Sequence, residues 1–440
     1  MIIGVGQYNH GFRTPSSILY LNSLFYLPFI KYFSFEIPAL LILGFSNLIL
    51  FFNIKEYFER KKFNYIFYLN LLFLAFLNIF FYRIQEHGTD RSAQILISIL
   101  FIQILTLINF DKSYKTQISN ILVLLGIIVS LKAFYILYLV VLLPLIWIFY
   151  KEKKLNTSIW YLLKNKYFYL FLLLVLLTLL VYFFNTGCLI YPLSVSCFNN
   201  FEWSLGAEVA LKMNNHYNLW SKGGHTPNFK VSDPETYLQN FNWVSNWINI
   251  YFFNKVSDFL IGLLALVIIT FVIFNYKKNK KLNLNYSKKN IILIYSIVLI
   301  LFFEWFVNHP ALRYGGYILV SLLLFIPFSI FLEKNQISID KLKLKLKILI
   351  SITIIVFISR NAVRINNEIE QYNYKPISNS FYRMHEGHFR IASNFEGLIK
   401  NYKDCKDKLK TCDLKRSKYV REVYPGRYIF ITDFYLTKDD

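Results

Sequence analysis

Apolar residues along the chain occur in long blocks that are separated by short polar breaks. A block of roughly 18–20 apolar residues is long enough to cross the hydrocarbon core of a membrane as an α-helix. The blocks cover residues 35–54, 63–82, 92–110, 118–150, 167–184, 257–276, 291–308, 316–333 and 342–359. We therefore predict an all-α polytopic membrane helix bundle across residues 35–359.

The basic residues between the blocks predict the side of the membrane on which each connection lies, because Lys and Arg are enriched in short cytoplasmic loops. Five basic loops are accordingly placed in the cytoplasm, at residues 55–64, 111–117, 151–166, 277–289 and 334–347. The other connections then lie outside, at residues 83–91, 185–256, 309–315 and 360–440. We expect the last of these to form a small extracytoplasmic C-terminal α+β domain.

The block from 118 to 150 is too long for a single span, and both of its flanks are basic. A helical pair that enters the membrane and returns satisfies both facts, with its break near Gly126–Lys132. With this re-entrant pair included, we expect about ten membrane passes.

Composition supports this class of protein. Of the 440 residues, 55% are hydrophobic and 17% are charged, against roughly 25% charge in an average soluble domain. The net charge of +22 does not indicate nucleic-acid binding, because the basic residues lie mostly at membrane edges and in the tail. The expected partner is the lipid bilayer, and nucleic acid is not expected.

Residues 1–34 are interpreted as an external N-terminal segment. Residues 1–15 have neither a charged start nor a long apolar run, so no signal peptide is indicated. Residues 16–33 are apolar but contain Pro28 and Lys31, which favours a helix lying at the outer interface over a first span. Since no earlier span would deliver this segment to the outside, we expect the chain to lack its first helix.

All four cysteines fall in the two large outer pieces of the chain. Cys188 and Cys197 lie in the loop, and Cys405 and Cys412 lie in the tail. Their spacing on the exported side predicts two local disulfides, Cys188–Cys197 and Cys405–Cys412, formed in an oxidising compartment. No pair of histidines adjoins them, so a zinc site is not indicated.

The connection 83–91 is the first candidate for chemistry, since it carries Glu86, His87, Asp90 and Arg91. Two carboxylates, a histidine and arginine suit general-base chemistry on a hydroxyl, or the binding of phosphate or metal. Asp90 is the strongest candidate for the base, and Glu86 is the alternative. The competing interpretation is a solvated turn in which Asp90 caps the next helix.

A second polar string occupies residues 304–317, and its candidate ligand-binding residues are His309, Arg313 and Tyr314. Arg313 can hold a phosphate with its planar guanidinium. Gly315–Gly316 would let the backbone approach a ligand closely. The competing interpretation is a belt of interfacial aromatic residues around a tight turn.

Two smaller features complete the candidate set. Lys132 is the lone charge of its apolar block, and it either meets a lipid phosphate or extends its ammonium to the interface. His10 and Arg13 are expected to be exposed on the outer side and to add to ligand binding. Because an isolated polar cluster facing lipid costs several kcal/mol, we expect all these segments to converge on one outer cavity, with Lys132 near its floor.

Many spans, a re-entrant pair, acidic outer loops and an outer C-terminal domain together resemble the GT-C membrane glycosyltransferases. This class includes the protein O-mannosyltransferases and the lipid A aminoarabinose transferases. The string NHGFRTPSSILYLNSLFYLP at residues 9–28 also resembles an uncharacterised family of bacterial multi-span proteins. The string HPALRYGGY at residues 309–317 resembles a late outer-loop segment of that same family.

The resemblance implies a glycosyltransferase of the bacterial inner membrane that moves a sugar from a polyprenyl-phosphate carrier to a periplasmic glycan, lipid or protein. The class uses an Asp of the first outer loop as base or metal ligand, but no Asp or Glu precedes Glu36 here. A chain without that loop would be inactive. The need for a divalent metal stays open.

Two other classes of function stay open beside the transferase. One is a polymerase or ligase of the O-antigen type, for which His216 and His225 of the outer loop would act on the lipid-linked sugar. The other is a lipid or glycan transporter that makes no glycosidic bond.

Overall fold

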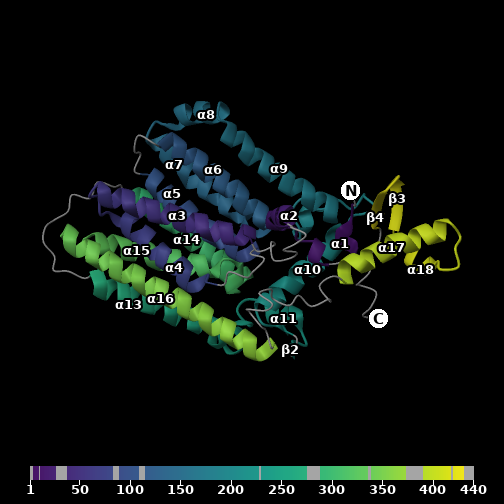
Figure 1. Ribbon diagram of the computed structural model, residues 1–440. Helices are drawn as coiled ribbons and strands as arrows, with labels where there is room; N and C mark the ends of the chain where they lie inside the picture. Colours follow the sequence, from purple (N-terminus) through teal and green to yellow (C-terminus); the bar gives the residue numbers. More distant parts are fainter. Residues whose placement is uncertain are drawn as a thin grey trace. The chain divides into compact units, whose positions relative to one another are not determined.

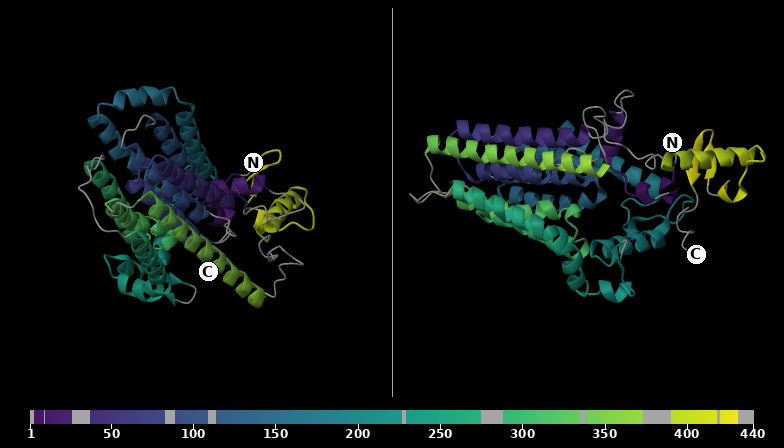
Figure 2. Two further views of the ribbon diagram at one scale, coloured as in Figure 1. Left: turned by 60° about the vertical axis from the view of Figure 1, so that its left-hand side comes forward. Right: turned by 60° about the horizontal axis from the view of Figure 1, so that its bottom comes forward.

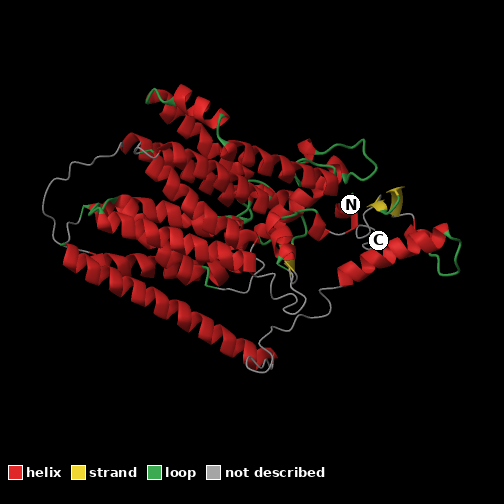
Figure 3. Ribbon diagram, turned by 45° about the horizontal axis from the view of Figure 1, so that its top comes forward, coloured by secondary structure: helices red, strands yellow, loops and turns green. Residues whose placement is uncertain are grey.

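The computed structural model is predominantly helical, and the strands among its described residues form two short hairpins (Figures 1 and 3). The structure describes residues 3–8, 10–25, 37–82, 89–108, 114–226, 229–274, 288–334, 338–372, 390–417 and 420–430. The chain divides into two compact units. The first unit comprises residues 1–16, 174–217 and 373–440, and the second comprises residues 17–173 and 218–372.

The second unit contains the apolar helices, and the long ones among them run alongside one another (Figures 1 and 2). They are α2 (Ser17–Leu24), α3 (Ile37–Glu59), α4 (Tyr65–Phe80), α5 (Thr89–Leu107), α6 (Tyr114–Leu131), α7 (Leu142–Lys151), α8 (Leu155–Leu163), α13 (Ser257–Phe274), α14 (Lys288–Asn308), α15 (Gly316–Glu333) and α16 (Ile339–Tyr372). Helices α9 (Lys166–Thr186) and α10 (Gly206–Ser221) contribute to both units.

Eight helical segments of the described ranges are long and apolar enough to cross a membrane. Helix α4 is shorter, and α16 extends well beyond the apolar block at 342–359 that predicts it. Each apolar block of the sequence therefore corresponds to one helix, except the block at 118–150, which contains α6 and α7. The chain is a multi-pass helical membrane protein, whereas the number of passes and their direction remain predictions.

Helix α4 lies at the centre of the second unit, where it packs against α3, α15 and α16. Most of its side chains are buried, and they include aromatic residues that meet Phe325 of α15 edge to face. Two amide pairs join α3 to α4, because Asn53 donates to Asn70 at 2.9 Å and Asn78 donates to Asn47 at 2.8 Å. These pairs satisfy polar groups that would otherwise face apolar surroundings.

An apolar cavity of about 400 Å³ lies among α3, α4 and α16. Gly44, Phe51, Leu74 and Phe357 line it, together with the Asn47–Asn78 pair. The cavity contains none of the residues that the sequence singles out for chemistry.

The long block from 118 to 150 is broken at one residue. Helix α6 ends at Leu131, Lys132 has an extended backbone at φ −162° and ψ 128°, and a 3₁₀ helix, η3 (Ala133–Val141), leads into α7. A pair of helical segments is therefore present, with its break at Lys132. Whether the pair is re-entrant is left as a prediction.

The connection between α10 and α13 is irregular. It contains β1 (His225–Thr226) paired with β2 (Phe229–Lys230), α11 (Pro234–Leu238), α12 (Val244–Trp247) and η5, a π-helical stretch (Ile248–Val256). This connection and η6 (Leu312–Tyr314), between α14 and α15, carry most of the polar residues discussed below.

The first unit combines the N-terminal segment, the region after α9 and the C-terminal tail. It contains α1 (Val5–Tyr8), η1 (His10–Phe12), η4 (Ser194–Ser196), α17 (Arg390–Lys406), α18 (Leu414–Ser417) and the hairpin of β3 (Val420–Tyr424) and β4 (Arg427–Phe430). The backbone N–H of Ile3 donates to the carbonyl of Tyr428 at 3.1 Å, which joins the N-terminal segment to the tail.

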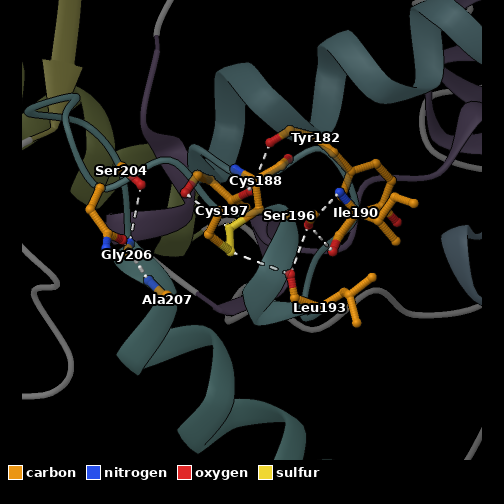
Figure 4. The surroundings of a disulfide bond; sticks show 11 residues. Tyr182, Cys188, Ile190, Leu193, Ser196, Cys197, Ser204, Gly206 and Ala207 are labelled. Carbon is orange, nitrogen blue, oxygen red and sulfur yellow. Dashed lines mark hydrogen bonds between the residues drawn. A yellow bond between two sulfur atoms is a disulfide. The ribbon is translucent and has the colours of Figure 1, made fainter.

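Both cysteine pairs are bonded in this first unit, Cys188 to Cys197 and Cys405 to Cys412. Around the first bond, the hydroxyl of Ser196 donates to the carbonyls of Ile190 and Leu193 and closes the loop between the two cysteines (Figure 4). The interfacial helix predicted at 16–33 falls partly outside the described residues, and α2 covers only Ser17–Leu24.

Candidate functional site

Three breaks between helices of the second unit come together at one end of the bundle. Helix α5 begins there, the α6–η3 junction places Lys132 there, and η6 turns between α14 and α15. Contacts of η6 with α5 and of η3 with α14 hold the three breaks side by side. Residues 83–91, which lead into α5, and residues 309–315, which contain η6, are connections that the charge pattern predicts on the outer side, whereas the break at Lys132 lies within an apolar block.

Asp90 lies in the first turn of α5 and contacts two cations. Its Oδ1 accepts from the Nζ of Lys132, and its Oδ2 lies 3.3 Å from the Nε of Arg313. The Asp90 and Lys132 side chains are 16% and 19% exposed, whereas Arg313 is half exposed. Since Asp90 is inside the helix and paired in this way, its role is not that of a simple N-cap.

Aromatic rings surround the two cations. The Lys132 ammonium lies 4.9 Å from the centre of the Tyr314 ring, and the Arg313 guanidinium lies 5.5 Å from the Trp220 ring. The His309 ring lies 5.8 Å from Tyr314 and 5.6 Å from Phe134. Such rings stabilise cations that have lost part of their water, and flat rings of this kind also stack on sugar faces.

The turn that carries His309 and Arg313 is held by hydrogen bonds from several elements. Trp305 donates to the carbonyl of Ala311 at 2.9 Å, and Trp247 donates to that of Pro310 at 3.1 Å. The amide of Gln94, one helical turn after Asp90, donates to the carbonyl of Arg313 at 3.0 Å. Gln94 therefore links α5 to the turn, and sequence reasoning missed it because a single buried glutamine has no distinguishing pattern.

The two glycines of this turn serve packing, which corrects the interpretation that they admit a ligand. Gly315 has φ +113°, a conformation that favours glycine, and a Cβ there would lie 3.2 Å from the Tyr138 hydroxyl. A Cβ on Gly316 would lie within 2.4 Å of the Trp305 ring. Both positions are filled by neighbouring side chains of the protein itself.

Lys222 is a further cation of this region that sequence reasoning did not identify. It directly follows α10, its side chain is buried, and its Nζ lies 5.0 Å from the centre of the Trp243 ring. Within the described part of the chain no carboxylate forms an ion pair with it. One lysine in a Lys-rich chain carries no sequence signal, so only its burial distinguishes it.

Two groups next to the turn have shifted pKa values. Burial, together with the charges of Lys222 and Lys132, lowers the pKa of His309 to about 4. His309 is therefore neutral at neutral pH. Burial also lowers the pKa of Lys222 to about 8, so this lysine is still mostly charged at pH 7.

The remaining predicted site residues fall in different parts of the chain. Arg91 follows Asp90 on α5, whereas Glu86 and His87 lie outside the described residues. His10 and Arg13 belong to the first unit. The expected exposure of Arg13 is wrong, because its side chain is 2% exposed and its Nε donates to the carbonyl of Gly6 at 2.8 Å. A charged group can be buried where a backbone carbonyl accepts its hydrogen bond.

No group of three His, Cys, Asp or Glu residues capable of holding a metal ion is found in the ranges that the structure describes. Asp90 supplies one carboxylate to the cluster, and Glu304 instead accepts from the amide of Asn308 at 3.2 Å. The chemistry that these residues support is the binding of an anion by cations beside one carboxylate.

Residues 2–320 match a family model described as a domain of unknown function, DUF8201. The chain belongs to this family. The matched range includes Asp90, Lys132, Lys222 and Arg313, and it ends before α16. No curated protein and no solved structure matches the chain.

Proposed function

We propose that this protein is a membrane glycosyltransferase that moves a sugar from a polyprenyl-phosphate carrier to an acceptor on the outer side of the membrane. The observation that carries the proposal is the contact of Asp90 with both Lys132 and Arg313 at the end of the helix bundle. Two cations beside one carboxylate are expected where the cations bind the phosphate of a substrate and the carboxylate accepts a proton from the acceptor.

In the proposed binding step, the phosphate of the carrier takes the place of the Asp90 carboxylate on the two cations. The guanidinium of Arg313 can donate two parallel hydrogen bonds to phosphate oxygens, and Lys132 adds a point charge. The half-exposed Arg313 is the accessible member of the pair, so it would meet the incoming phosphate first. Trp220 and Tyr314 offer flat faces to the sugar.

In the proposed transfer step, the freed carboxylate of Asp90 accepts the proton of the acceptor hydroxyl. A bond forms between the acceptor oxygen and the sugar anomeric carbon, and the bond from that carbon to the phosphate oxygen breaks. The lipid phosphate leaves with the electron pair, and Lys132 and Arg313 stabilise its negative charge.

The proposal is tested in membranes that contain the protein and a polyprenyl-phosphate carrier with a radiolabelled sugar. Wild-type protein should move label from the lipid fraction into a new glycosidic product, and Asp90→Asn should reduce this transfer at least a hundredfold. Glu59→Gln is the matched control, because Glu59 is an exposed carboxylate paired with Lys55. Equal transfer by Asp90→Asn and wild type would exclude the proposed base, and lipid flux without a new glycosidic bond would indicate a transporter.

A further inference from the structure

Lys222 differs from Lys132 and Arg313 in its contacts. Lys132 and Arg313 both contact Asp90, whereas Lys222 is 3% exposed and contacts the face of Trp243. Removing an ammonium from water is costly, and contact with one ring recovers only part of that cost. A buried lysine that forms no ion pair with a carboxylate of the described residues is therefore suited to binding an anion from outside the protein.

The backbone that carries Lys222 is held firmly. The hydroxyl of Tyr237 donates to the carbonyl of Lys222 at 2.8 Å, and the amide of Asn246 donates to the carbonyl of Gly223 at 3.1 Å. Asn246 also donates to the Tyr237 hydroxyl at 2.8 Å, which closes the network. Gly223 has φ +79°, so the chain turns sharply after the lysine. These hydrogen bonds fix the backbone position of Lys222, which a lysine on the exposed surface does not require.

Lys222 lies next to the cluster formed by Asp90, Lys132 and Arg313. Two residues earlier on α10, Trp220 faces the Arg313 guanidinium. Ser221 donates to the carbonyl of Asn308, directly before His309. The His309 ring lies 5.8 Å from the Tyr314 ring, which the Lys132 ammonium faces at 4.9 Å.

We infer that Lys222 forms a second anion position beside Lys132 and Arg313, and that the site takes a diphosphate rather than a monophosphate group. The inference rests on the proposed function and specifies its donor: the sugar would be linked to the lipid through a diphosphate. One phosphate would contact Arg313 and Lys132, and the next would contact Lys222. The neutral His309, whose ring lies beside Tyr314, can donate a hydrogen bond to the ligand without adding charge.

The inference is tested by binding of farnesyl diphosphate, farnesyl phosphate, pyrophosphate and phosphate to the full chain in nanodiscs at fixed salt. Wild-type protein should bind farnesyl diphosphate at least about tenfold more tightly than farnesyl phosphate. Lys222→Met should reduce that preference to less than about twofold and leave farnesyl phosphate binding unchanged. Lys222→Arg should retain it, and Lys212→Met, at an exposed lysine of α10, should behave as wild type.

Arg313→Gln separates this inference from the function on which it rests, because it should weaken both farnesyl ligands. If neither ligand binds wild-type protein, the proposed function fails. If both bind equally well and Lys222→Met changes neither, only the diphosphate inference is overturned. Pyrophosphate binding as tight as that of farnesyl diphosphate would support the second anion position and identify a water-soluble source of the ligand.

A second measurement uses wild-type protein alone and so does not depend on the folding of a variant. Because the pKa of Lys222 is lowered to about 8, the preference for the diphosphate should shrink as the pH rises from 7 to 9. The groups around Lys222 are the Trp243 ring and the Tyr237 hydroxyl, and the charges of Lys222 and Lys132 both act on the neutral His309. A preference that stays constant or grows over this range would contradict the role given to Lys222.

Discussion

The carboxylate of Asp90 and the ammonium of Lys132 are in contact, although 42 residues separate them in sequence. Asp90 begins one helix, and Lys132 occupies the single extended residue between two others. Arg313 reaches the same carboxylate from a third connection. An acid and two cations from three separate helix breaks therefore form one cluster, and four predictions follow from its surroundings and from the first unit.

Asp90→Asn should lower the stability of the protein, because it leaves Lys132 and Arg313 without the carboxylate that now contacts both. The expected loss is about 1–3 kcal/mol for a partly buried charge that loses its partner. Adding Lys132→Met should recover most of this loss but no transfer activity. Thermal unfolding in detergent measures both variants, and strictly additive effects would contradict the pairing.

Raising the pH should stabilise the fold through Lys222. Its pKa in the folded protein is about 8, below its ordinary value of 10.5, so between these values the unfolded chain binds more protons than the folded one. The free energy of unfolding must then rise with pH in that window. Comparing wild type with Lys222→Met from pH 8 to 9.5 isolates this contribution, and identical pH profiles would refute it.

Gly316→Ala should destabilise the protein by about 1–3 kcal/mol, because its Cβ would overlap the Trp305 ring. Trp305→Phe in the same chain should relieve part of the clash. Gly44→Ala is the matched control, since a Cβ on Gly44 of α3 meets nothing within 4 Å. That control should be neutral or slightly stabilising, as expected for alanine in a helix. Equal effects of the two alanine substitutions on the unfolding temperature would be evidence against the packing role.

The two disulfides should be intact in protein taken from an oxidising compartment, so no cysteine should react with an alkylating reagent before reduction. After reduction, Cys197 should react faster than Cys188, which is fully buried. Replacing Cys188 and Cys197 together with serine should cost about 2–3 kcal/mol, the entropy of closing a short loop. Mass spectrometry of peptides before reduction checks the pairing, and four reactive thiols would disprove it.

The sequence by itself determined where the helices lie. Membrane thickness sets the number of apolar residues that one spanning helix needs. The pattern of apolar and polar residues along the chain is therefore enough to locate α3, α13, α14 and α15. The break at Lys132 could also be predicted, because the block is too long for one span and Lys132 is its lone charge. Asp90 and Arg313 could be selected as candidates, since charges near the ends of spans are costly unless they are used.

Only the tertiary structure decided which of these groups meet and what surrounds them. Lys222 and Gln94 carry no local signal, because their importance lies in burial and in partners far away in sequence. Gly315 and Gly316 suggested a ligand, but the Tyr138 hydroxyl and the Trp305 ring occupy the space beside them. Arg13 was expected in water and is buried against a backbone carbonyl. Length and polarity act along the chain, whereas contact, burial and charge pairing depend on how the helices pack.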